Sequence, residues 1–211
     1  MAITGLDHII YATPDLDLGI EEIRALTGVE PMLGGSHPGR GTRNALLSLG
    51  PDTYIEILAP DPAQSAEALA CAADQIPSTG RLAAWAAKCD DLEGVMKTAA
   101  QGALDLGRIE SMSRTRPSGE QLAWRLTRGT SPADGLVPFL IDWGESPHPA
   151  RSAPTGCSLR YFRGEHPDPA HVRNYLALLG LEDVLEVFRG PVPRMLAGLL
   201  TPNGEVVLVG C

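Results

Sequence analysis

Two strand-like segments carry side chains that could bind a metal, His8 in residues 6–12 and Glu56 in residues 53–58. Successive side chains of a strand point to opposite faces, so His8 shares a face with Ile10, and Glu56 shares one with Leu58. A neutral imidazole and a carboxylate are ligands that Zn, Fe, Mn and Ni accept. We therefore predict that His8 and Glu56 face one cavity and hold a divalent metal there. The alternatives are a hydrogen-bonded core histidine and an ion pair between Glu56 and an arginine such as Arg43.

A glycine-rich segment, residues 34–42, places further polar groups between two strands. We expect His37 to lie in a loop there and to complete the metal shell or move a proton, as a catalytic residue with Glu56. Asn44 lies on the strand face opposite Ala45 and Leu47, which predicts that it faces the cavity and binds substrate together with Thr42. The alternatives are an ordinary surface loop for His37 and a structural cap for Asn44.

Arginines on later strands are candidates for binding an anionic substrate. Arg114 and Arg116 alternate on one face, and Arg125 lies on the face away from Trp124. A guanidinium can bind a carboxylate or phosphate through two parallel hydrogen bonds. The alternative for each arginine is a solvated surface position. We expect the tryptophans in the core, and we expect three histidines at surface positions: His148, His166 and His171.

These residues belong to a chain order of strand, helix and three strands that occurs three times. In the first copy, residues 6–12 form a strand, Thr13 caps a helix with Pro14 at its first position, and Gly28 ends the helix. Strands are expected next near residues 30–33, 44–49 and 53–58.

The second copy begins with a strand at residues 82–88 and a helix capped by Asp90 or Asp91, followed by strands near residues 108–116, 121–128 and 136–143. In the third copy, a strand at residues 157–163 precedes a helix that begins at Asp168 and Pro169 and ends at Gly180. Its strands are expected near residues 184–188, 195–200 and 205–209.

This order predicts an α+β protein of three βαβββ units that pair into curled mixed sheets, since one unit alone leaves a sheet face open. The units span residues 1–59, 81–143 and 157–211. The linkers are residues 60–80, with a helix at 63–73, and the Pro- and Ser-rich residues 144–156.

Composition excludes several classes of function. The net charge of −9 over 211 residues argues against binding to nucleic acid or to an anionic membrane surface. We expect no transmembrane segment and no signal peptide, because the chain opens with a short strand that lacks a basic region. The four cysteines are far apart, which favours free thiols in the cytoplasm over a metal knuckle.

Several short motifs resemble the vicinal oxygen chelate superfamily, and within it the glyoxalase-like families. Leu6-Asp7-His8-Ile9 and Tyr54-Ile55-Glu56-Ile57-Leu58 are similar to its metal-ligand strands. Gly41-Thr42-Arg43-Asn44 after His37, and Phe139-Leu140-Ile141-Asp142-Trp143 before His148-Pro149, are also similar to that group. The resemblance covers nearly the whole chain and implies paired βαβββ units and a divalent metal that binds two neighbouring oxygens of a substrate.

The chain departs from that pattern in the later units, from which such sites take further ligands. Ala84 and Arg160 stand at the positions that correspond to His8, and neither binds a metal. Asp142 is the expected counterpart of Glu56 and is predicted to be catalytic, whereas the third unit has Leu208 there. We expect the third unit to be structural and to support a homodimer.

The resemblance implies two alternative functions. The first is a divalent-metal-dependent lyase, isomerase or dioxygenase that acts on a small oxygen-bearing, anionic metabolite. The second is a metal-free protein of the same fold that binds or sequesters a small ligand, which the missing ligands at Ala84 and Arg160 favour.

Overall fold

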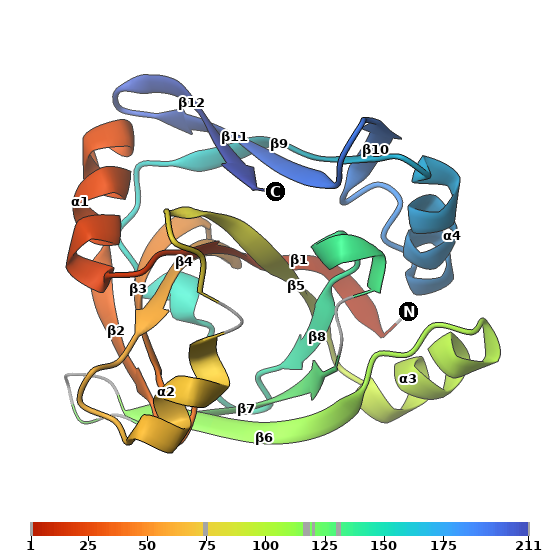
Figure 1. Ribbon diagram of the computed structural model, residues 1–211, viewed down its shortest axis with the longest axis horizontal. Helices are drawn as coiled ribbons and strands as arrows, with labels where there is room; N and C mark the ends of the chain where they lie inside the picture. The colour runs from red at the N-terminus through yellow and green to blue at the C-terminus, as the bar shows by residue number, and fades with distance from the viewer. Residues whose placement is uncertain (1, 74–75, 116–118, 120, 130–131, 211) are drawn as a thin grey trace.

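A computed structural model describes residues 2–73, 76–115, 119, 121–129 and 132–210. Its elements repeat the predicted order of strand, helix and three strands three times, which confirms the fold class (Figure 1). The first unit has β1 (Ile3–Ala12), α1 (Leu16–Thr27), β2 (Met32–His37), β3 (Thr42–Gly50) and β4 (Thr53–Pro60). The second has β5 (Arg81–Cys89), α3 (Leu92–Gln101), β6 (Arg108–Thr115), β7 (Gln121–Arg128) and β8 (Phe139–Asp142). The third has β9 (Ser158–His166), α4 (Pro169–Leu179), β10 (Glu186–Arg189), β11 (Arg194–Thr201) and β12 (Gly204–Gly210). The short helix α2 (Ala66–Ala72) lies between the first two units.

The first two units form one eight-stranded sheet in the order β2-β3-β4-β1-β5-β8-β7-β6. In each unit the first strand pairs in parallel with the last, and the units join through antiparallel β1 and β5. The sheet curls until its edges nearly meet, as Figure 1 shows. A Cβ atom added at Gly35 in β2 would lie 2.8 Å from the carbonyl oxygen of Thr115 in β6. Glycine therefore permits the near closure of the barrel.

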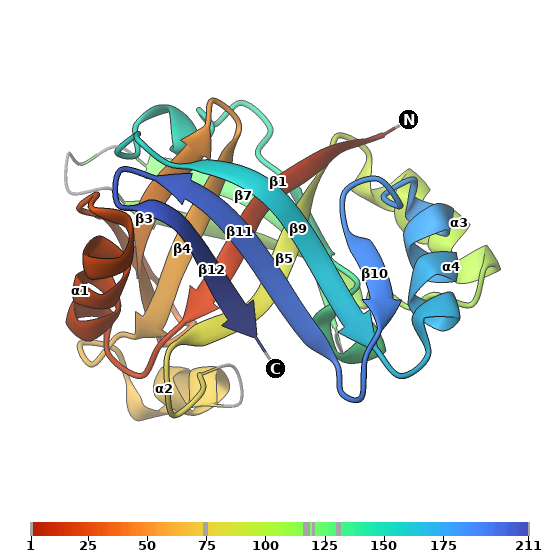
Figure 2. The same cartoon turned by 90° about the horizontal axis from the view of Figure 1, so that it is seen from above.

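The third unit has the same chain order but a different pairing. Its sheet order is β10-β9-β11-β12, so its first strand pairs in parallel with its second strand rather than with its last. This sheet lies across the outside of the barrel, over β1 and β5 (Figure 2). Phe162 of β9 meets Trp85 of β5 edge to face, with ring centroids 5.4 Å apart. A single hydrophobic core includes buried residues from all three units.

Helix ends follow the expected capping chemistry, with one correction. Asp168 caps α4 with Pro169 in its first turn, and Gly28 and Gly180 end α1 and α4 with φ of 76° and 68°. The N-cap of α1, however, is Asp15 and not Thr13, because the Thr13 amide still bonds the Leu58 carbonyl at 2.9 Å. The chain thus leaves the sheet two residues later than predicted.

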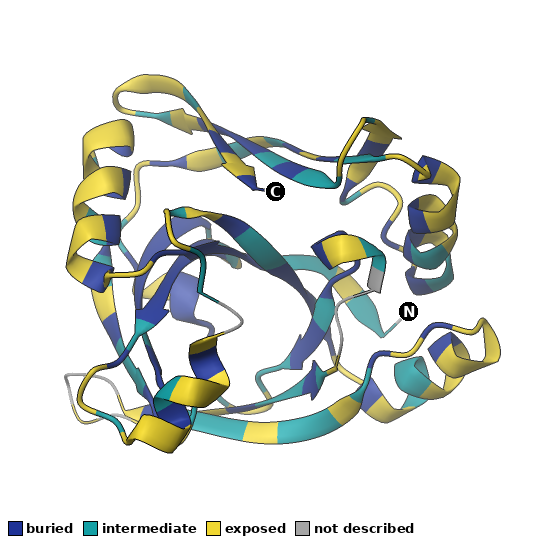
Figure 3. Ribbon diagram, viewed as in Figure 1, coloured by how far each residue is buried: buried dark blue, intermediate teal, exposed yellow. Residues whose placement is uncertain are grey.

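Burial separates the two sides of these elements. The helices are exposed on their outer sides, whereas long stretches of β1, β3, β4 and β5 are buried (Figure 3). Among the described residues, no helix has the length and apolar character needed to cross a membrane. The unit boundaries and the homodimer stay predictions.

Candidate functional site

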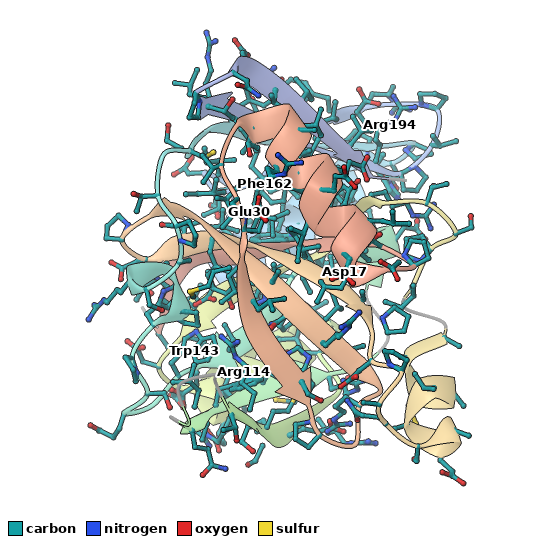
Figure 4. All side chains as sticks on the ribbon, turned by 90° about the vertical axis from the view of Figure 1, so that its left-hand side faces the viewer. Asp17, Glu30, Arg114, Trp143, Phe162 and Arg194 are labelled. Atoms are coloured by element: carbon teal, nitrogen blue, oxygen red, sulfur yellow. The ribbon has the colours of Figure 1, made fainter. Side chains whose placement is uncertain are left out.

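The barrel encloses a cavity of about 330 Å³ whose wall combines polar and apolar side chains. The polar group includes His8, His37, Thr42, Asn44, Tyr54, Glu56 and Arg114. The apolar group includes Ile10, Leu58, Met112, Trp124, Leu126, Phe139, Ile141 and Trp143. Figure 4 shows Arg114 and Trp143 at the level of the barrel, away from Phe162 and Arg194 of the third unit. All of the polar side chains named above are buried.

His8 and Glu56 meet in this cavity. In the parallel pair of β1 and β4, Ile10 is the register partner of Glu56, and His8 that of Tyr54. His8 Nε2 lies 3.5 Å from Glu56 Oε2, and both side chains are about nine-tenths buried or more. The imidazole also stacks on Tyr54, with ring centroids 4.7 Å apart.

Asp7, which was not among the predicted site residues, bonds the ring nitrogen of His8 that points away from Glu56. Asp7 Oδ1 lies 2.7 Å from His8 Nδ1, and Asp7 Oδ2 accepts hydrogen bonds from Trp143 Nε1 at 3.0 Å and His148 Nε2 at 3.1 Å. Although burial alone would raise it, the pKa of the Asp7 carboxyl is held below its usual value by the hydrogen bonds from His148 and His8. An ionised carboxylate can only accept, so His8 Nδ1 is the donor, and in the neutral ring the lone pair on Nε2 faces Glu56.

A β-bulge explains why strand alternation did not predict the contact between Asp7 and His8. Strict alternation puts Asp7 and His8 on opposite faces of β1. The pairing of β1 with β5, however, shifts register between Leu6 and His8, which leaves Asp7 as the extra residue. A bulge re-aims a side chain in this way. The same contact corrects the expectation for His148, which is buried and bonded to Asp7 rather than at the surface.

A second polar chain reaches Glu56 from β2, β3 and β6. Asn44 Nδ2 donates to Glu56 Oε1 at 2.6 Å and to His37 Nε2 at 3.2 Å, while Asn44 Oδ1 accepts from Arg114 Nη1 at 3.4 Å. His37 Nδ1 lies 2.9 Å from Thr42 Oγ1. The Asn44 amide nitrogen can only donate, so His37 Nε2 accepts and Nδ1 donates to Thr42.

Burial sets the protonation of two ring side chains in this chain of contacts. Burial lowers the pKa of His37, and nearby Arg114 and His8 act in the same direction against Glu56. His37 is therefore neutral at neutral pH. Burial, with Asp7 and Glu56 nearby, raises the pKa of Tyr54 well above its usual value, so its hydroxyl stays protonated.

The structure places the predicted residues unevenly. His8, His37, Thr42, Asn44, Glu56 and Arg114 line the cavity. His37 is the last residue of β2 rather than part of a loop, since it pairs with Thr42 of β3. The position of Arg116 lies outside the described residues.

Two predicted site residues lie outside the cavity. Asp142 and Arg125 pair with each other at 2.7 Å on the outer side of the barrel, where Arg125 also contacts Glu93 at 2.7 Å. The expected alternation of β8 holds, but its cavity face carries Ile141 and Trp143 and not Asp142. The structure therefore does not bring Asp142 and Arg125 together with the other predicted site residues, and their roles in catalysis and substrate binding stay predictions.

Arg43, the ion-pair partner considered as the alternative for Glu56, lies elsewhere. Arg43 is turned away, with Nη2 4.0 Å from the exposed Asp17. The arginine that reaches the Glu56 carboxylate is Arg114, through the Asn44 side chain. Ala84 lines the cavity without a ligating atom, and Arg160 is exposed and paired with Glu205.

His8 and Glu56 fit a divalent cation, although they supply only two donors. A lone pair on His8 Nε2 that faces Glu56 Oε2 at 3.5 Å is repulsive unless a proton or a cation lies between them. The hydrogen bond from His8 Nδ1 to Asp7 is the usual support of a metal-bound histidine. His37 Nε2 is already bonded to Asn44. Among the described residues, no group of three or more His, Cys, Asp or Glu side chains is placed to hold a metal ion.

Two βαβββ units that curl around a polar cavity define the vicinal oxygen chelate fold, in agreement with the resemblance of the sequence. Residues 6–180 match the family model described as Glyoxalase-like domain. The chain belongs to this family of glyoxalase-like domains. Among curated proteins, none matches the sequence.

Solved structures share the fold at low sequence identity. A hypothetical protein from Staphylococcus aureus is 19% identical with a TM-score of 0.64, and the match covers 96% of this chain and 84% of that chain. Methylmalonyl-CoA epimerase from Mycobacterium tuberculosis is 20% identical with a TM-score of 0.42, over 67% of this chain and 87% of that one. A methylmalonyl-CoA epimerase in complex with methylmalonyl-CoA and NH4+ is 22% identical with a TM-score of 0.46, over 70% and 99%. The first match extends the shared fold to the third unit.

Proposed function

We propose that this protein is a lyase or isomerase that binds a small anionic, oxygen-bearing molecule in the barrel cavity with the help of a divalent metal. The observation that carries the proposal is the approach of His8 Nε2 to Glu56 Oε2 at 3.5 Å, with Asp7 behind His8. His8 and Glu56 would hold the metal, and Zn, Fe, Mn and Ni accept such ligands. When bound, the metal would act as a Lewis acid that polarises a substrate oxygen.

The remaining residues fit a proton transfer. Arg114 is positively charged and buried in the cavity wall, where it can bind a substrate carboxylate. His37 is neutral, and its Nε2 lone pair would accept a proton from a carbon next to the substrate carbonyl once the Asn44 amide no longer donates to it. Return of that proton to a neighbouring carbon gives an isomerase, and loss of a leaving group from that carbon gives a lyase. The apolar side chains of the wall would limit the access of water to the transfer.

Metal content tests the proposal directly. Protein purified without chelator and reconstituted with Zn, Mn, Fe(II) or Ni is expected to hold about one metal ion per chain, since one His8–Glu56 pair is present. The variants His8→Ala and Glu56→Gln are expected to lose it, as measured by elemental analysis after gel filtration. The matched control is Asp142→Asn, which removes a carboxylate outside the cavity and should leave the metal bound. Absence of stoichiometric metal from the reconstituted wild type would contradict the metal-dependent function.

A second candidate function is a metal-free binding protein, because Asn44 already occupies both His37 Nε2 and Glu56 Oε1. In that case small organic acids should raise the melting temperature equally with and without EDTA. A ligand at about 100 times its Kd stabilises the fold by about 2.7 kcal/mol. The shift should disappear in Arg114→Gln and persist in Arg125→Gln, whose arginine lies outside the cavity. A shift that requires added metal would instead favour the metal-dependent enzyme.

A further inference from the structure

The charge of the cavity wall is opposite to that of the whole protein. The chain has a net charge of −9. Three arginines nevertheless line the cavity, Arg40, Arg114 and Arg128, and Glu56 is the one carboxylate among the described lining residues. A concave site with an excess of one charge attracts ligands of the opposite charge. The cavity is therefore suited to an anion, and its three arginines are not equivalent.

The arginines lie at two depths. Arg114 is 2% exposed and belongs to the chain of contacts that includes Asn44 and Glu56. The side chains of Arg40 and Arg128 are 28% and 31% exposed, although both line the cavity. They therefore lie at its mouth, where the cavity meets solvent.

One carboxylate serves the arginines at the mouth. Glu110 lies 2.5 Å from Arg40 Nη2, 2.6 Å from Arg108 Nη2 and 3.9 Å from Arg128 Nε. Burial lowers the pKa of Arg128, and nearby Arg40 lowers it further, against the opposite effect of Glu110. A single carboxylate thus leaves positive charge at the mouth that a ligand anion would neutralise.

The position of Arg40 is fixed by the segment that leads into α2. Gly41, next to Arg40, donates its amide to Gln64 Oε1 at 3.1 Å and accepts from the Asp61 amide at 2.8 Å. Gly41 has φ of 69°, and an added Cβ would lie 2.1 Å from the Ala68 carbonyl oxygen. Only glycine fits this turn, so the backbone next to Arg40 is held in place by packing and hydrogen bonds.

The two depths are far apart along β6. Arg108 pairs with Arg128 in the β6–β7 register, and Arg114 pairs with Leu122. The backbones of Arg114 and Arg128 are thus separated by six residues of strand, which is about 20 Å at about 3.3 Å per residue. The Arg114 guanidinium contacts Asn44 and that of Arg40 contacts Glu110, so a molecule with an anionic group at each end suits the two places.

We infer that Arg40 and Arg128 form a second anion-binding subsite at the cavity mouth, so that the ligand is an extended molecule with a carboxylate or phosphate at the end remote from Arg114. This inference rests on the proposed function for the inner end, where Arg114 binds the anionic group next to His8 and Glu56. The outer subsite sets the length and the charge of the molecule that the protein accepts.

Calorimetric titration with unbranched dicarboxylates of increasing length tests the inference. Succinate, adipate, suberate and sebacate are compared with monocarboxylates of the same length. In the wild type, the longer dicarboxylates should bind about tenfold more tightly than their monocarboxylate partners, because the outer end gains a charge-assisted hydrogen bond. The double variant Arg40→Gln/Arg128→Gln should lose this difference. Arg108→Gln should retain it, because Arg108 also contacts Glu110 but is 79% exposed and does not line the cavity.

The outcomes separate the outer subsite from the inner one. Ligands of the same length that carry a phosphonate in place of one carboxylate show whether the mouth prefers a phosphate group. Binding of monocarboxylates that is lost in Arg114→Gln and partly restored in Arg114→Lys would support the inner site. If the dicarboxylates then bind no more tightly than the monocarboxylates, the outer subsite is refuted while the inner site stands. An equal difference in affinity between dicarboxylates and monocarboxylates in Arg40→Gln/Arg128→Gln and in Arg108→Gln would also refute the outer subsite. If no carboxylate binds the correctly folded wild type, both the inference and the anionic substrate of the proposed function fail.

Discussion

Substitution of Asp7 by alanine is expected to reduce the free energy of unfolding by about 3–5 kcal/mol, as for other buried charged networks that lose one partner. The Asp7 carboxylate is fully buried and bonds His8, Trp143 and His148. Its removal leaves two buried histidine donors and the part-buried Trp143 indole without an acceptor, and each unsatisfied buried donor costs about 1–3 kcal/mol. Denaturant unfolding at neutral pH measures the loss.

The pH dependence of this loss identifies its cause. The pKa of Asp7 is lower in the folded protein than its ordinary value of 3.8. The unfolded chain therefore binds the proton more readily, and stability rises with pH through this range. The contribution of Asp7 is fully present above pH 3.8 and is lost as pH falls toward the folded pKa, so the wild type and Asp7→Ala should converge in acid.

Two further variants serve as controls for Asp7. Asp142→Ala removes a partly exposed ion pair with Arg125 and should cost no more than about 1 kcal/mol. Asp7→Asn keeps the shape, but its amide nitrogen donates, which favours the His8 tautomer with the proton on Nε2. That variant should fold and bind metal about 10–100-fold more weakly. An equal loss of stability in Asp7→Ala and Asp142→Ala would refute the role given to the Asp7 network.

Local patterns in the sequence predicted the elements well, but they determined which face turns toward the cavity only in some of the strands. Alternation along β1 and β4 places His8 and Glu56 on one face, because both strands carry apolar residues on the opposite face that pack in the core. In β8 both faces are apolar, so alternation cannot say which faces the cavity, and Asp142 was assigned to the wrong one. Asp7 depends on a bulge that has no signal in the sequence.

The sequence patterns also did not predict which strands and residues distant in the chain lie side by side. Caps and glycines specified the chain order of the third unit, yet β9 pairs with β10 rather than with β12. The contact between Arg114 and Asn44 exists because the barrel brings β6 close to β2 and β3, although the two residues are 70 positions apart. Such contacts depend on how the whole sheet curls, and period and propensity within one strand do not determine it.

Replacement of Trp85 by alanine is the second change with a large expected effect, again about 3–5 kcal/mol of unfolding free energy. Trp85 is fully buried in β5, its indole N–H donates to the Leu136 carbonyl at 3.1 Å, and its ring packs on Phe162. It therefore joins the barrel to the sheet of the third unit. Because the core is continuous across all three units, we expect the wild type to unfold in one cooperative transition seen equally by fluorescence and circular dichroism.

A double-mutant cycle locates the effect at the contact between the barrel and the third unit. Trp85→Ala and Phe162→Ala should be coupled by about 0.5–1.5 kcal/mol, the range for aromatic pairs. Phe188→Ala, at a side chain that is 41% exposed on the third unit, should change stability by no more than about 0.5 kcal/mol. Two separate transitions in the wild type, or additive effects of Trp85→Ala and Phe162→Ala, would mean that the third unit folds independently of the barrel. One coupled transition would instead mean that the barrel, whose cavity wall includes Trp85, depends for its stability on a sheet that contributes no residue to the cavity lining.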